Sequence, residues 1–94
     1  MSIVTTCSNG DMHWRNVRGQ LHREDGPAII CANGDKRWYM KDLRHRGDGP
    51  AIEYANGHIE WWYKNIFFTN VHDMMKISEI SEDNMTMLIL KYGR

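Results

Sequence analysis

The chain has 94 residues, enough for one small domain with a thin hydrophobic core and little room for a deep catalytic cleft. Its 12 Lys and Arg residues balance its 12 Asp and Glu residues, so no overall field steers the protein toward nucleic acid or a membrane. No run approaches the roughly 18 consecutive apolar residues that a membrane span needs. The sequence has two cysteines and no recognisable signal peptide, so we expect a protein of the reducing cytoplasm.

The first predicted elements are strand pairs around Asn-Gly turns. Asn-Gly occurs at residues 9–10, 33–34 and 56–57, each time between extended, β-prone segments. This dipeptide favours a two-residue type I′ turn, which needs positive φ at both central residues. The sequence therefore predicts three β-hairpins.

A two-residue loop also predicts which residues share a face. It places Ile29 opposite Trp38 and Cys31 opposite Lys36. In the third hairpin it places Glu53 opposite Glu60, which requires a solvated face because like charges repel. The opposite face would then be apolar through all three hairpins and would carry three tryptophans in register: Trp14, Trp38 and Trp61.

Two polar segments link these hairpins. The segment from His22 to Ile29 returns after 23 residues as the segment from His45 to Ile52, with seven of eight positions identical. Such a period is typical of stacked copies of one supersecondary unit. In each copy Asp-Gly-Pro predicts a turn, because Gly supplies special φ values, Pro suits a strand start and Asp can accept backbone hydrogen bonds.

The polar residues of these turns are His22, Asp25, His45 and Asp48. They allow two interpretations. An imidazole near a carboxylate could act in general acid–base catalysis, as in a small hydrolase. A residue set needed once for chemistry has no reason to recur in each copy, whereas hydrogen-bonded turns do. We therefore predict a structural role for these four residues and no catalytic residue.

The repeated pattern resembles a family. It consists of a tryptophan followed by an aromatic residue, His-Arg-x-Asp-Gly-Pro-Ala, a short apolar run and Asn-Gly. This pattern is similar to the MORN-like (HRxDGPA-type) repeats found in bacteriophages and large viruses, over roughly residues 7–63. The resemblance implies a β-hairpin sheet that binds a partner rather than catalysing a reaction.

The periodicity changes after Phe68. Apolar residues then recur at helical spacing, which predicts a short helix near residues 70–76 and a longer one near residues 82–92. Ser81 would cap the second helix, and Ile89 would lie on its inward side. We predict an α+β protein: a twisted antiparallel sheet of three repeated hairpins (residues 1–68), with two short helices (residues 69–94) covering its tryptophan face.

Cationic and aromatic side chains mark the predicted exposed face. Between residues 13 and 46, eight Lys and Arg residues occur with four Asp and Glu residues. Aromatic rings can stack on bases, and Arg can contact phosphates. A merely solvated face is the alternative. The predicted site for a protein partner or RNA comprises Arg15, Lys36, Arg37, Tyr39 and Arg44.

Cys7 and Cys31 occupy the same repeat position and lack metal-ligand spacing, so we expect thiols that pack as small hydrophobic groups, with no metal and no cofactor.

The predicted function is that of a non-enzymatic phage protein in the host cytoplasm. It would bind and neutralise a host factor such as a defence toxin or nuclease. The alternatives are a stand-alone RNA-binding module and, less favoured, a small hydrolase. We expect no membrane partner, and a homo-oligomer stays open.

Overall fold

The structure is a computed structural model that describes residues 3–77 and 80–92. It contains short strands followed by two helices. The elements are β1 (Ile3–Thr6), β2 (Met12–Arg15), β3 (Ile29–Ile30), β4 (Lys36–Arg37), β5 (Tyr39–Met40), β6 (Leu43–Arg44), β7 (Ile52–Glu53), β8 (Ile59–Tyr63), β9 (Ile66–Phe68), α1 (Val71–Met74) and α2 (Glu82–Tyr92).

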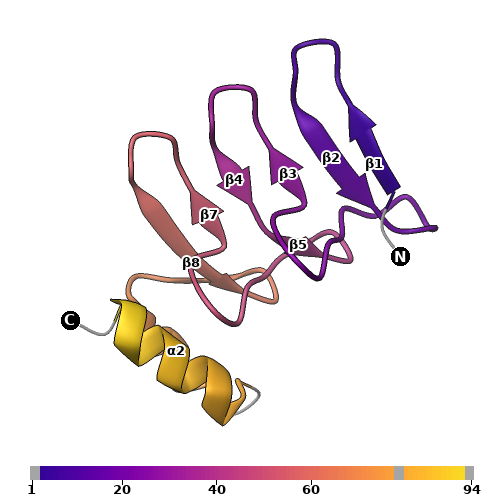
Figure 1. Ribbon diagram of the computed structural model, residues 1–94. Helices are drawn as coiled ribbons and strands as arrows, with labels where there is room; N and C mark the ends of the chain where they lie inside the picture. The colour runs from indigo at the N-terminus through magenta and orange to yellow at the C-terminus, as the bar shows by residue number, and fades with distance from the viewer. Residues whose placement is uncertain (1–2, 78–79, 93–94) are drawn as a thin grey trace.

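Seven strands form one sheet in the order β1-β2-β3-β4-β7-β8-β9, and β5 pairs with β6 separately. Every pairing is antiparallel, and the strands step across the molecule from the N-terminal end to the C-terminal helices (Figure 1). These features confirm the predicted α+β class, the antiparallel sheet and the two short C-terminal helices.

The Asn-Gly turns differ from the predicted type. In the second one, the Cys31 N–H donates to the Asp35 carbonyl at 2.8 Å and the Gly34 N–H donates to the Cys31 carbonyl at 2.9 Å. The loop therefore contains three residues, and only its glycine has positive φ, +102° at Gly34. This is a type I turn completed by a left-handed glycine, so the type I′ prediction is wrong.

One extra loop residue shifts the strand register by one. Ile29 lies opposite Arg37 instead of Trp38, and Lys36 lies opposite Ile30 instead of Cys31. In the third hairpin, Glu53 lies opposite Ile59 and Glu60 opposite Ile52. The predicted pairings were therefore wrong, and the two glutamates avoid the like-charge contact that a two-residue loop would have imposed.

Two-residue turns with positive φ at both positions occur elsewhere. Lys41 and Asp42, at φ 50° and 67°, connect β5 to β6. Lys64 and Asn65, at φ 48° and 67°, connect β8 to β9. Residues with a Cβ rarely adopt this region, so both turns need support from their surroundings.

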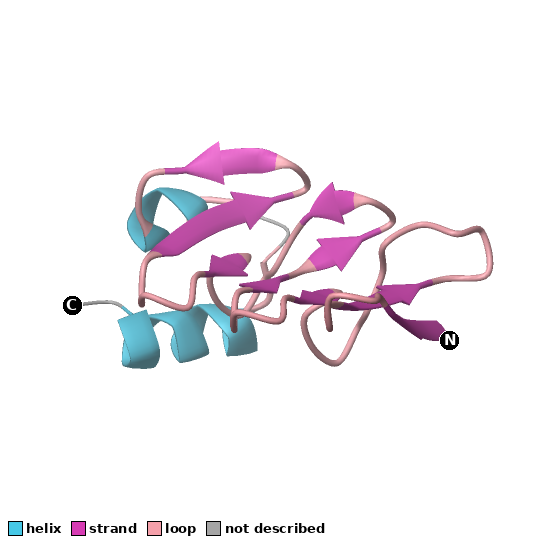
Figure 2. Ribbon diagram, turned by 90° about the horizontal axis from the view of Figure 1, so that it is seen from above, coloured by secondary structure: helices cyan, strands magenta, loops and turns pink. Residues whose placement is uncertain are grey.

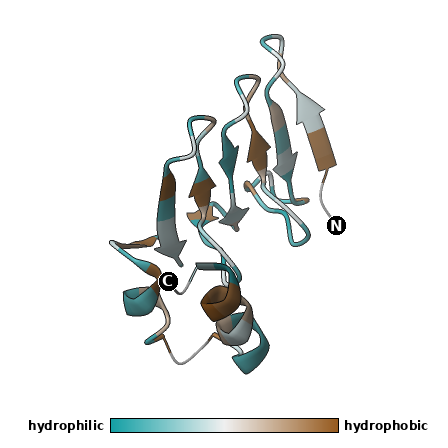
Figure 3. Cartoon of the chain, turned by 60° about the vertical axis from the view of Figure 1, so that its left-hand side comes forward, coloured by the Kyte–Doolittle hydropathy of each residue, from teal (hydrophilic) through white to brown (hydrophobic). Residues whose placement is uncertain are grey.

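The hydrophobic core lies at the C-terminal end. Its buried members are Trp61, Tyr63, Val71, Met74, Ile80 and Leu88. Both helices flank the last hairpin, whereas the N-terminal hairpin extends away from them (Figure 2). Figure 3 shows strongly hydrophobic residues in α2 and mixed hydropathy along the strands.

The predicted cover over all three tryptophans is therefore wrong. Trp61 is buried against the helices, while Trp14 and Trp38 are only half-buried. Ile89 was predicted to face inward but is 53% exposed. The predicted cap of α2 is confirmed, because the Asn84 N–H donates to Ser81 Oγ at 3.2 Å.

Candidate functional site

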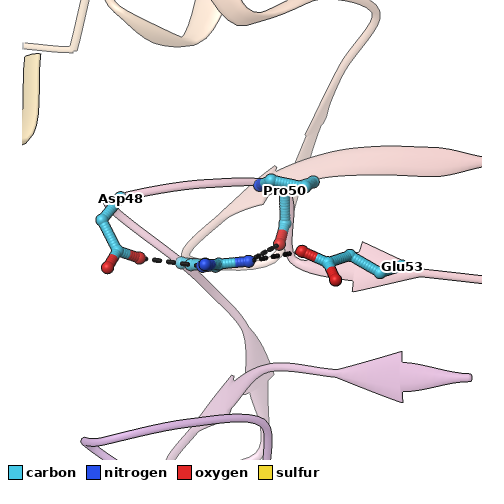
Figure 4. Close-up of polar contacts among 4 residues, drawn as sticks. Asp48, Pro50 and Glu53 are labelled. Atoms are coloured by element: carbon cyan, nitrogen blue, oxygen red, sulfur yellow. Dashed lines mark hydrogen bonds and ion pairs between the residues drawn. The ribbon is translucent and has the colours of Figure 1, made fainter. Parts of the chain in front are cut away.

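Each Asp-Gly-Pro turn is organised by an arginine. We call residues 22–27 the first corner and residues 45–50 the second corner. Arg46 donates from Nε to Asp48 at 2.8 Å, and from an Nη to the Pro50 carbonyl at 3.1 Å and to Glu53 at 2.9 Å. Figure 4 shows Asp48, Pro50 and Glu53 gathered around this guanidinium. Charge-assisted, forked contacts of this kind fix an arginine in one orientation.

The first corner repeats two of these contacts. Arg23 donates to Asp25 at 2.9 Å and to the Pro27 carbonyl at 3.2 Å. Among the described residues, Arg23 has no third acceptor that corresponds to Glu53, because the equivalent position is Ile30. The hydrogen bond from Arg23 lowers the pKa of the Asp25 carboxyl, so this group is a charged acceptor at neutral pH.

The same guanidinium groups cover two tryptophans. The central carbon of Arg23 lies 4.0 Å from the ring centroid of Trp14, and that of Arg46 lies 4.0 Å from the ring centroid of Trp38. A Cβ on Gly49 would come within 2.6 Å of the Arg46 guanidinium carbon, so the glycine makes room for it. Cation–π contacts thus cover Trp14 and Trp38, which lie outside the hydrophobic core.

The corner histidines bind backbone. His22 is buried, and its Nδ1 accepts a hydrogen bond from the Lys41 N–H at 3.1 Å. His45 Nδ1 accepts from the Lys64 N–H at 3.0 Å. Both donors are the first residues of the positive-φ turns, so each imidazole supports a strained turn 19 residues farther along the chain. These contacts are the ones that an architectural role requires.

A cleft of about 540 Å³ separates the two corners. Trp38 and Met40 line it, together with His45 and with Asn84 from α2. The acid–base alternative would have to act here, because the corner aspartates also line the cleft. Asp25 and Asp48, however, each bind an arginine Nε. The cleft therefore offers aspartates that are paired with arginines, and the imidazole of His45, which already binds backbone.

The described residues include no group of three or more His, Cys, Asp or Glu side chains that could hold a metal ion. Cys7 and Cys31 are free and half-buried. Within residues 3–77 and 80–92, no helix has the length and apolar character needed to cross a bilayer.

A connected set of cationic and aromatic side chains extends from the seven-stranded sheet to the β5–β6 pair. Arg37 lies 5.9 Å from the ring centroid of Tyr54, and Arg44 lies 4.7 Å from that of Trp62. Glu60 joins the two pairs, because it accepts from Tyr54 Oη at 3.2 Å and from Trp62 Nε1 at 3.0 Å. We call these five residues the candidate binding surface. All five are partly exposed, so a partner can reach them.

The predicted site residues divide into two groups. Arg37 and Arg44 belong to the candidate binding surface, and Tyr39 pairs with Arg44 across β5 and β6. Arg15 lies on β2 and donates to the Gly19 carbonyl at 2.9 Å. Lys36 is exposed and lies opposite Glu53, on the side of the strand away from Arg37. The structure brings three of the five predicted residues together and leaves Arg15 and Lys36 apart.

Tyr54 and Glu60 were missed by the sequence prediction. Burial, followed by the nearby Glu60 carboxylate, raises the pKa of Tyr54, so its hydroxyl stays a hydrogen-bond donor at neutral pH. A three-residue loop at residues 55–57 would have placed Glu60 opposite Ile52, on the face of Arg37. The length of this loop was therefore the sequence signal that could have placed Glu60 beside Arg37.

Comparison of the chain with protein-family models, with curated proteins and with solved structures gave no match.

Proposed function

We propose that this chain is a non-enzymatic interaction protein built from MORN-like repeated hairpins, and that it binds and neutralises a host protein through the candidate binding surface. As the sequence resemblance implies, the protein would belong to a phage. It would act in the host cytoplasm against a factor such as a defence toxin or nuclease. The connected set from Arg37 to Arg44 is the observation that carries the proposed binding role.

Recurring contacts support the repeated unit. The His22 bond to Lys41 recurs as the His45 bond to Lys64. The Arg23 contact with Trp14 recurs as the Arg46 contact with Trp38. The turns are linked in the same periodic way: Asp11 Oδ1 accepts from the Ala32 N–H and Asp35 Oδ1 from the Ala55 N–H, both at 2.7 Å.

Two features favour binding over catalysis. The corner histidines and aspartates, which would carry the alternative chemistry, already hold backbone turns and arginines. The candidate binding surface instead combines arginines with partly exposed aromatic rings, residue types that often dominate binding energy at protein interfaces. Its two guanidinium groups lie over rings and so need little side-chain ordering when a partner binds.

An affinity capture from bacterial lysate tests this proposal. The reagents are the wild-type chain, the double variant Arg37→Ala with Arg44→Ala, and the control Arg18→Ala with Lys76→Ala. Both double variants remove two positive charges, but Arg18 and Lys76 are exposed and lie outside the candidate binding surface. We expect the wild type and the control to capture the same host protein and the surface variant to lose at least 90% of it, which corresponds to roughly 1.4 kcal/mol or more.

The same capture with ribonuclease separates protein from RNA. A host protein that remains bound after ribonuclease supports the proposal, and its activity should then fall when the purified wild-type chain is added. Loss of all captured material with ribonuclease favours the RNA-binding alternative. In that case each lost arginine should reduce the slope of log affinity against log salt by about one. Equal capture by all three chains contradicts the assigned surface.

A further inference from the structure

The sheet has one open edge at each end. At the N-terminal end, β1 pairs with β2 alone among the described strands. At the other end, β9 pairs with β8 from Trp61 to Tyr63, so among the described strands Ile59 and Glu60 have a partner on the β7 side alone. Figure 1 shows these two edges at opposite ends of the row of hairpins.

Within the sheet, strand segments equivalent to these two edges pair with each other. The start of β2 pairs with β3, with Met12 opposite Ile30 and His13 opposite Ile29. The start of β4 receives β7, with Lys36 opposite Glu53 and Arg37 opposite Ile52. Counted from their Asn-Gly turns, Ile59 and Glu60 correspond to Lys36 and Arg37, and Thr5 and Thr6 correspond to Ile29 and Ile30. The start of β8 is therefore a junction that lacks its incoming strand.

A cleft of about 460 Å³ lies beside this junction. Ile59, Trp61, Val71 and Tyr92 line it, so much of its wall is apolar. Ile59 is 38% exposed there. After Phe68, where a third corner would follow in the repeat, the chain forms α1 and α2 instead. The two helices do not fill the space beside the first half of β8, and this space is the cleft.

Strand β1 has the composition of an incoming strand. Its sequence is Ile-Val-Thr-Thr, all β-branched, and Ile3 and Val4 are 56% and 49% exposed. Figure 3 shows the hydrophobic half of this edge strand next to the N-terminus. Exposed edges of this kind usually carry a charge or a proline that blocks pairing, and β1 has neither.

We propose that two copies of this chain associate head to tail, with β1 of the second copy added to the open edge of β8 in the first. The inference rests on the proposed repeat architecture, because it extends the β2–β3 and β4–β7 junctions across two molecules. Ile59 would pair with Thr6 of the second copy, and Glu60 with Thr5. The interface is heterologous, so further copies can add and align their candidate binding surfaces in a row.

The turn-to-turn bonds extend in the same way. Asp11 and Asp35 accept from the N–H groups of Ala32 and Ala55 in the next turn. His58 holds the equivalent position in the third hairpin, and Ser8 holds the position of the two alanines in the first. An unprotonated imidazole nitrogen is an acceptor, so His58 of one copy can receive the Ser8 N–H of the next.

Analytical ultracentrifugation of the purified chain tests this proposal without the host partner. We expect the weight-average mass of the wild type to rise with concentration up to the millimolar range. Two double variants then test the register: Ile59→Lys with Thr6→Lys, and Ile59→Lys with Thr6→Glu. Positions 6 and 59 lie at opposite ends of the sheet, so the substituted side chains meet only between copies.

The lysine–lysine variant places like charges opposite each other, and the lysine–glutamate variant places opposite charges there. We expect the association constant of the second to exceed that of the first roughly tenfold, and the difference to shrink at high salt. Thermal melts compare the folded state of both variants. Equal association of two folded variants refutes the register, and a β1-to-β1 dimer would give that result.

A wild type that stays monomeric at every concentration refutes the association itself, even if both variants fail to fold. This failure is distinct from failure of the proposed function, because the capture experiment uses the candidate binding surface at low protein concentration. A monomer that still captures its host protein would leave the proposed function intact.

Discussion

The two ends of this sheet are stabilised by different chemistry. The third hairpin packs Trp61 and Tyr63 against Met74 and Leu88, which are fully buried. The tryptophans of the first two hairpins, Trp14 and Trp38, lie outside this core and under arginines instead. One end thus depends on apolar burial and the other on oriented guanidinium groups and polar side chains bound to backbone.

This difference shows how a thin sheet can extend beyond its core. A hairpin two strands wide buries too little apolar surface to be stable alone. Each corner adds a bond to a later turn, such as that of His22 with Lys41, and the Asn-Gly turns are linked to one another by bonds such as that of Asp11 with Ala32. Directional bonds therefore connect hairpins where there is no room for a second hydrophobic layer, and the helices complete the core only at the end.

The largest expected effect is in the core. Leu88→Ala removes a fully buried side chain and should lower the free energy of unfolding by about 2–5 kcal/mol, a large part of the stability of a domain this small. Urea denaturation followed by circular dichroism measures the change. Leu90→Ala, on the same helix but 74% exposed, is the matched control and should change stability by less than about 0.5 kcal/mol. Similar losses in both variants would mean that α2 does not complete the core.

An intermediate effect is expected at the corners. Arg46→Ala should lower stability by about 1–3 kcal/mol, because it removes bonds to Asp48, Pro50 and Glu53 and uncovers Trp38. Arg23→Ala should lower it less, since Arg23 lacks the third acceptor and its side chain is 22% exposed against 14% for Arg46. Chemical denaturation of both variants gives the comparison.

Conservative variants separate charge from packing at the same positions. Arg46→Lys keeps the charge but not the fork, so it should recover only a minor part of the loss. If Arg23→Ala proves as destabilising as Arg46→Ala, the additional bond to Glu53 contributes nothing measurable. If neither variant changes stability, the corners do not hold the N-terminal hairpins.

Much of the fold could be predicted from the sequence because its signals are local. Helical spacing and Ser81 located α2 at residues 82–92, and Asn-Gly located the turns of the sheet. The turn type could not be predicted from Asn-Gly alone, since this dipeptide suits both a two-residue turn and a three-residue loop with a left-handed glycine. The one additional loop residue determines that Glu60 lies opposite Ile52 and not opposite Glu53.

The site was harder to predict because its contacts join residues distant in sequence. Arg37 was predicted from the assignment of the exposed face and Arg44 as its neighbour at the hairpin connection, but the contacts of Tyr54 and Glu60 depend on the true strand register. The covering of Trp38 by Arg46 depends on a chain reversal at the corner, which hydrophobic periodicity does not report. The same periodicity placed Ile89 inside, although the helix packs mainly through Leu88.

The smallest expected effect concerns the link between the first two turns. Asp11 Oδ1 accepts from the Ala32 N–H at 2.7 Å, and this bond, followed by that from Asn9, lowers the pKa of the Asp11 carboxyl. A carboxyl whose pKa is lower in the folded state adds stability above its ordinary pKa of about 3.9, and that stability is lost as the pH falls through the folded-state value. Asp11→Asn keeps an acceptor oxygen without the charge. It should therefore be less stable than the wild type at pH 6, with the difference closing below about pH 4, in urea denaturation series at each pH. A difference that stays constant from neutral to acidic pH would show that the turn link does not depend on the carboxylate charge.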